Sequence, residues 1–125
     1  MVLTGCLPSA DTASLLFQTS HSGRAELGLT GDDRLHLKVS PDGLSWTEAL
    51  VVDGATGKVG LGVASPAVAL DVGGPLGLKT CLKAALPAAT PAGQLIYISD
   101  EADGATPAFA DGTNWRRVAD RAVVS

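Results

Sequence analysis

Hydrophobic and polar residues alternate with a period of two along much of the first half of the chain. The alternation is clearest over residues 34–39, RLHLKV, where every second residue is apolar. Successive side chains of a β-strand point to opposite faces, so this pattern predicts a strand with one apolar and one polar face. We expect the apolar set, Leu35, Leu37 and Val39, to face the core. We expect the polar set, Arg34, His36 and Lys38, to face water.

Similar short segments lie on both sides of this strand, and turn residues separate them. Residues 14–19 (SLLFQT) and 24–30 (RAELGLT) precede it, and residues 45–52 (SWTEALVV) follow it. Glycine, proline and aspartate fill the connections, for example Pro41-Asp42-Gly43, and these residues favour tight turns. Turns at intervals of about ten residues are typical of all-β proteins. We therefore predict an all-β fold, with short antiparallel strands in a meander.

The next stretch, residues 58–74 (KVGLGVASPAVALDVGG), combines two strand-like pieces with closely spaced glycines. In residues 59–63 the apolar side chains share one face of an extended chain, and both glycines occupy the other. A face without side chains lets another backbone approach closely, as in chains stacked around a shared axis. An ordinary strand with a bulge is the alternative. The predicted contacts between copies are Val59, Gly60, Leu61, Gly62, Val63, Leu70 and Val72.

The Ala- and Pro-rich run at residues 82–92 predicts a boundary between modules. One helical turn fits Cys81–Leu86, whereas Pro87 and Pro91 exclude a long helix. Beyond this run, residues 93–99 predict a strand, and residues 108–118 predict a hairpin. The expected divisions are an attachment arm (1–13), a β meander and oligomerisation region (14–81), a linker (82–92) and a C-terminal β module (93–125).

The composition supports a core that copies of the chain complete together. The chain has 15 Gly and 7 Pro, and aromatic residues make up only 4%. Large core-filling side chains are therefore scarce, which fits a homo-oligomer in which several copies share one core. A small Ala-rich sandwich is the alternative.

Charge and cysteine content narrow the classes of partner. The net charge of −4 gives no basic patch for nucleic acid. The first residues lack a charged start and a continuous apolar run, so we expect neither a secretory signal nor membrane insertion, and synthesis in the cytoplasm. Cys6 and Cys81 have no companion cysteines and are expected to be free thiols. We predict no metal site and no cofactor.

Residues for catalysis are scarce, and surface binding is the expected chemistry. His21 and His36 are the only histidines, and neither belongs to a recognisable nucleophile motif, so we predict no catalytic residues. An aromatic ring beside planar polar groups is a typical arrangement for binding sugars. Packing against the module beneath is the alternative for Trp115. The candidate carbohydrate-binding residues are Trp115, Asn114, Arg116, Tyr97 and Trp46.

Two segments carry a resemblance to phage proteins. Val59-Gly60-Leu61-Gly62, Pro66, Leu70-Asp71-Val72 and Gly74 resemble a VGIGTxxPxxxLDVxG segment that recurs in tail-fibre and spike proteins of tailed phages. Residues 97–100 (YISD) and 109–118 (FADGTNWRRV) resemble the C-terminal end of tail and spike proteins in phages and phage-derived gene transfer agents. With residues 25–53, the resemblance covers most of the chain.

This resemblance implies a non-enzymatic structural virion protein, a tail fibre or head spike that helps a phage or gene transfer agent particle attach to a bacterium. It implies a homotrimer, with a pentamer as the alternative, whose N-terminal region binds another virion protein such as a spike base, tail or capsid protein. The expected ligand is bacterial surface polysaccharide. The alternatives are a structural connector or cap, a polysaccharide-degrading spike enzyme, and a free-standing cytosolic β-sandwich.

Overall fold

The computed structural model describes Pro8 and residues 10–124, and the chain forms two compact units, Met1–Pro75 and Leu76–Ser125. Strands make up 42% of the chain and helical turns 3%, which confirms the all-β prediction. Most of the predicted N-terminal arm lies outside the described residues, as does Cys6. The last two residues of that arm, Thr12 and Ala13, begin the first strand.

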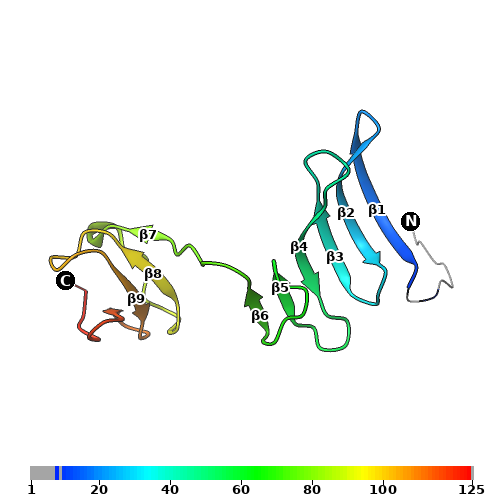
Figure 1. Ribbon diagram of the computed structural model, residues 1–125. Coiled ribbons are helices and arrows are strands. Elements are labelled where there is room, and N and C mark those ends of the chain that lie inside the picture. Colours follow the sequence, from blue (N-terminus) through cyan, green and yellow to red (C-terminus); the bar gives the residue numbers. More distant parts are fainter. Residues whose placement is uncertain (1–7, 9, 125) are drawn as a thin grey trace. The chain divides into compact units, whose positions relative to one another are not determined.

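The N-terminal unit is a six-stranded sheet in which the strands follow one another in chain order (Figure 1). Its strands are β1 (Thr12–Thr19), β2 (Ser22–Thr30), β3 (Leu35–Val39), β4 (Thr47–Val52), β5 (Val59–Leu61) and β6 (Leu70–Val72). Strands β1 to β5 pair antiparallel, as the predicted meander requires. The last pair, β5 and β6, is parallel, so the sheet is mixed rather than purely antiparallel.

Short turns with residue-specific chemistry set the register of this sheet. Between β1 and β2, Ser20 and His21 have positive φ values of 49° and 64°, which suits a two-residue hairpin turn. Between β3 and β4, one carboxylate oxygen of Asp42 accepts hydrogen bonds from the backbone N–H groups of Leu44 and Ser45, at 2.8 and 2.7 Å. Asp53 accepts in the same way from Ala55 and Thr56 before β5.

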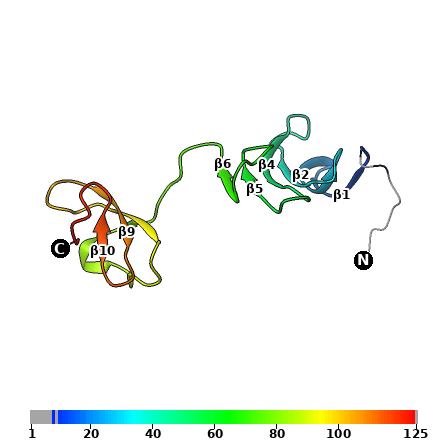
Figure 2. The ribbon, with the colours of Figure 1, turned by 90° about the horizontal axis from the view of Figure 1, so that it is seen from below.

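The C-terminal unit is a four-stranded sheet in the order β10, β9, β8, β7, and Figure 2 shows β10 beside β9. Its strands are β7 (Thr80–Cys81), β8 (Leu95–Ile98), β9 (Thr106–Ala110) and β10 (Trp115–Arg117). Strand β7 runs parallel to β8, and the other pairs are antiparallel. The helical turn expected near Cys81 is present as a 3₁₀ turn at Lys83–Ala85.

The predicted division of the chain is wrong at two places. Residues 76–81 do not belong to the meander, because β7 pairs with β8 of the C-terminal sheet. Residues 82–92 are not a free linker either. Ala89 is buried in the C-terminal core, and the carbonyl of Pro87 accepts a hydrogen bond from Trp115 Nε1 at 2.7 Å. The division between the units falls after Pro75 instead.

The C-terminal unit closes its own hydrophobic core. Trp115 is 5% exposed and packs with buried side chains from three strands and the Ala/Pro run. The members of this core are Cys81, Ala89, Ile96, Ile98, Ala108, Ala110 and Trp115, with Leu86 and Val124 packed against it. Cys81 is a free, buried thiol, as predicted.

Candidate functional site

The registry of the N-terminal sheet places apolar residues in continuous rows on one face. One row crosses every strand through directly opposed residues. A second row does the same two residues away along β1, on the same face of the sheet. The first row is Leu15, Leu27, Leu37, Leu50, Leu61 and Val72. The second row is Ala13, Leu29, Leu35, Val52, Val59 and Leu70. Phe17, Ala25 and Val39 continue the same face over the first strands. We call this surface the leucine face.

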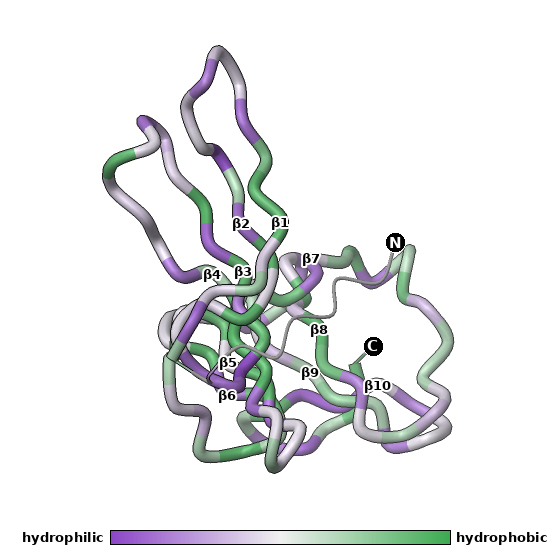
Figure 3. The backbone as a smooth tube through the Cα atoms, turned by 90° about the vertical axis from the view of Figure 1, so that its right-hand side faces the viewer, coloured by the Kyte–Doolittle hydropathy of each residue, from purple (hydrophilic) through white to green (hydrophobic). Residues whose placement is uncertain are grey.

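The leucine face is open to solvent in the single chain. Leu15 is 44% exposed, Phe17 is 54% exposed and Leu35 is 41% exposed, although all three lie within strands. Figure 3 shows hydrophobic stretches recurring among hydrophilic ones along these strands. The predicted orientation of β3 is therefore wrong: its period of two is correct, but its apolar side is the uncovered one.

The opposite face of this sheet holds a network of charged groups around His36. Although it was expected to face water, His36 is only 6% exposed. Its Nε2 lies 2.7 Å from Asp32 Oδ1, and its Nδ1 lies 3.0 Å from Glu48 Oε2. The hydrogen bond from His36 holds the pKa of Asp32 below its ordinary value. His36 and the leucines lie on opposite faces of the sheet. The face with His36 is covered, and the leucine face is not.

The connection between β5 and β6 covers the same charged face with backbone. A Cβ atom added to Gly60 would lie 2.0 Å from the carbonyl oxygen of Val63. Arg34 fastens this connection by donating to the carbonyl of Ala64 at 3.0 Å. The glycine therefore permits a close backbone approach, as predicted, but the approaching backbone belongs to the same chain.

The predicted contacts between copies consequently divide into two groups. Val59, Leu61, Leu70 and Val72 lie in the rows of the leucine face. Gly60 and Val63 lie on the charged face, and Gly62 has a φ of 65° in the turn after β5, so these three are not part of the leucine face. The predicted contacts between copies did not include residues of β1 to β4. The alternation of apolar and polar residues within 24–30 and 34–39 was the signal that could have placed β2 and β3 on this surface.

The predicted sugar-binding residues are not brought together in one site. The burial of Trp115 and its bond to Pro87 make it a core residue, in agreement with the packing alternative. Trp46 belongs to the N-terminal unit, where its ring lies so close to Gly23 that a Cβ atom added there would be 2.8 Å from it. Asn114 is exposed in the turn before β10, and its backbone N–H donates to Asp111 at 2.7 Å.

Tyr97 and Arg116 do share a surface, the outer face of the C-terminal sheet. Opposed pairs place Leu95, Phe109 and Arg116 in one row, with Tyr97 opposite Pro107 in the next. Tyr97 is 36% exposed, and Arg116 donates from Nε to Asp111. We call these five residues the tyrosine face. The tyrosine face combines aromatic rings with a guanidinium group. Phe109 was not among the predicted carbohydrate-binding residues.

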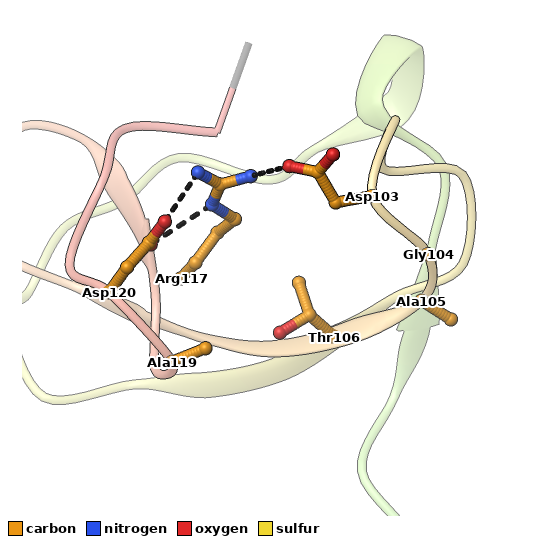
Figure 4. A pocket seen from close by; sticks show the side chains of 7 residues that line it. All are labelled: Asp103, Gly104, Ala105, Thr106, Arg117, Ala119 and Asp120. Atoms are coloured by element: carbon orange, nitrogen blue, oxygen red, sulfur yellow. Dashed lines mark hydrogen bonds and ion pairs between the residues drawn. The ribbon is translucent and has the colours of Figure 1, made fainter.

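A pocket of about 280 Å³ lies elsewhere on the C-terminal unit, beside Arg117 (Figure 4). Arg117 donates to Asp120 from two nitrogens, at 3.1 and 2.6 Å, and to Asp103 at 3.2 Å. The hydrogen bond to Asp120 is the main cause that raises the pKa of Arg117. Arg117 is thus paired with carboxylates of its own unit. The guanidinium is already occupied, so the pocket offers little to an anionic ligand.

Two further observations concern function. In the described part of the chain, no helix is long and apolar enough to cross a membrane, and no group of His, Cys, Asp and Glu side chains is arranged to hold a metal ion. Comparison with protein-family models gives no match, and comparison with curated proteins gives no significant match.

Proposed function

We propose that this protein is a structural fibre or spike component of a phage or gene transfer agent particle, and that it contributes to attachment of the particle to a bacterial surface. The observation that carries the proposal is that the N-terminal unit leaves its leucine face uncovered, whereas the C-terminal unit completes its own core. A chain built in this way suits assembly through one unit and display of the other. The resemblance of residues 59–74 and 97–118 to phage fibre and spike proteins supports the same function.

The tyrosine face is the best candidate for the ligand surface. Tyr97 and Phe109 provide ring faces on which a sugar can stack, and Arg116 adds a planar guanidinium group beside them. Bacterial surface polysaccharide is the proposed ligand. Weak binding by each copy would be multiplied when several copies are held in one oligomer. Of the five residues predicted to bind carbohydrate, the tyrosine face retains Tyr97 and Arg116 and leaves out the buried Trp115.

A connector or cap protein without ligand binding is the second candidate. The burial of Trp115 favours it, because the most promising sugar-binding ring is committed to the core. A polysaccharide-degrading enzyme has less support. The carboxylates of Asp42, Asp53 and Asp111 are occupied by backbone N–H groups of their own turns.

Binding of particles to capsulated cells tests the proposal. We expect purified particles to contain the protein, and particles that lack it to bind capsulated cells at least about tenfold more weakly. Tyr97→Ala with Arg116→Ala should reduce binding similarly, whereas Leu76→Ala, an exposed change before β7 and outside the strands of the sheet, should not. Undiminished binding without the protein would overturn the attachment role and leave the connector. Absence of the protein from purified particles would overturn both.

A further inference from the structure

We infer that the leucine face is the surface through which copies of this chain assemble, with the face of one copy buried against that of another. The inference deepens the oligomeric part of the proposed function, but it depends on no virion role. It assigns the contact to two rows across β1 to β6 and a third over β1 to β3, instead of to the glycine-rich stretch alone.

The N-terminal unit buries few apolar side chains of its own. Among its described residues, Val51 is the only buried hydrophobic one, at 0% exposure, whereas seven buried hydrophobic residues form the C-terminal core. Burial of apolar area is the main favourable term in folding, at about 25 cal/mol per Å². A six-stranded sheet that buries one valine lacks most of this term. A stable form of the unit therefore requires something to cover the leucine face.

The size of the leucine face follows from the dimensions of the sheet. Six strands spaced about 4.8 Å apart give a sheet about 24 Å wide. About five residues per strand, at about 3.3 Å each, give a length of about 17 Å. This is about 400 Å² in projection, and projecting side chains make the accessible area larger. The largest apolar patch on a typical monomer is about 300–600 Å², and a stable interface buries about 800 Å² on each partner. In projection the leucine face therefore amounts to about half of the area that each partner of a stable interface buries.

The composition of the leucine face identifies its occupant. Every position in the two complete rows is Ala, Leu or Val, so the occupant must present an uncharged apolar surface of similar size. The charged face of the same sheet cannot do so, because it carries His36, Glu48 and the covering connection. The C-terminal tyrosine face is smaller and includes Arg116. The leucine face of a second copy meets the requirement, since two such sheets can pack about 10 Å apart.

Adjacent residues on β1 provide a matched test. Leu15 and Leu16 are 44% and 51% exposed on the same edge strand, but Leu15 lies on the leucine face and Leu16 opposite Glu26 on the charged face. Light scattering of the full chain over a range of concentrations should show an oligomer. We expect Leu15→Lys to raise the dissociation constant at least about tenfold, and Leu16→Lys to leave it nearly unchanged. Equal effects of the two changes, or a monomeric wild type at all concentrations, would overturn the inference.

A second measurement covers the case in which Leu15→Lys fails to fold. In a Cys6→Ser background, Leu15→Cys and Leu16→Cys are labelled with a maleimide under conditions that favour the oligomer. Labelling at position 15 should be at least about tenfold slower, and dilution should remove the difference. An oligomer in which both positions react equally would place the interface elsewhere. Protection of position 15 in a monomer would show that the chain's own C-terminal unit covers the face. Either result would overturn the inference, while the particle-binding experiment would still test the attachment role separately.

Discussion

At the scale of single residues, aspartates define the turns of both units through the same contacts. Asp42-Gly43 and Asp111-Gly112 begin two DGxxW segments, with glycine φ values of 82° and 101°. In both segments the carboxylate accepts hydrogen bonds from the N–H groups two and three residues later. The DGxxW motif therefore forms the same turn in both units. The two tryptophans differ in surroundings, since Trp115 is buried and Trp46 is 36% exposed.

The turn at Asp111 predicts a specific dependence of stability on pH. Hydrogen bonds from the backbone of Asn114 and Thr113, followed by that from Arg116, lower the pKa of Asp111 to about 2. A folded-state pKa below the unfolded value means that the carboxylate stabilises the fold above about pH 4, and that this contribution is lost as the pH falls towards about 2. Asp111→Asn should therefore destabilise the C-terminal unit at neutral pH and flatten its loss of stability in acid.

Urea unfolding followed by tryptophan fluorescence, at several pH values between about 2 and 7, measures this effect. Asp103→Asn is a suitable control, because Asp103 is exposed and its carboxylate accepts a hydrogen bond from Arg117 rather than from a backbone N–H group of a turn. Parallel pH profiles for the wild type and Asp111→Asn would contradict the prediction.

At the scale of strands and connections, the link between β5 and β6 depends on the missing side chain of Gly60. Gly60→Ala would place a methyl group against the backbone at Val63 and force the connection away from the sheet. We expect a loss of about 1–3 kcal/mol in the free energy of unfolding, as is typical of overpacking. Gly74→Ala is the matched control, because a Cβ atom there meets no atom within 4 Å. Denaturant unfolding at one fixed chain concentration should separate the two, and equal stability would contradict the assigned contact.

The positions of the strands could be predicted from the sequence, and their covered faces could not. Alternation and turn residues located β2, β3 and β4 to within a few residues. Alternation shows that two faces differ, but it does not show which one is covered, and this is why His36 and Leu35 were assigned to the wrong sides. Strand β7 and the buried Ala89 lie in segments without a clear period, and the parallel pairing of β6 has no local signal. The tyrosine face depends on register, so only Tyr97 and Arg116 of it were anticipated.

At the scale of the whole molecule, the two units should respond differently to dilution. The C-terminal unit contains its own core, whereas the inferred assembly has the N-terminal sheet covered by the leucine face of another copy. Anything that binds only the folded state raises apparent stability in proportion to the logarithm of its concentration. Thermal unfolding of the full chain should therefore show an N-terminal transition that rises with chain concentration and a C-terminal transition that does not. Two transitions that are both independent of concentration would contradict this prediction.

The uneven distribution of buried side chains also has a consequence for the order of folding. The C-terminal core forms within one chain, so its formation is a first-order process. Covering the leucine face requires an encounter between chains, so completion of the N-terminal sheet is second order. During synthesis the N-terminal sheet emerges first but is completed last, and until then its open leucine face and the unpaired edge of β1 are exposed to aggregation. A local supply of nascent chains made close together would shorten this vulnerable interval.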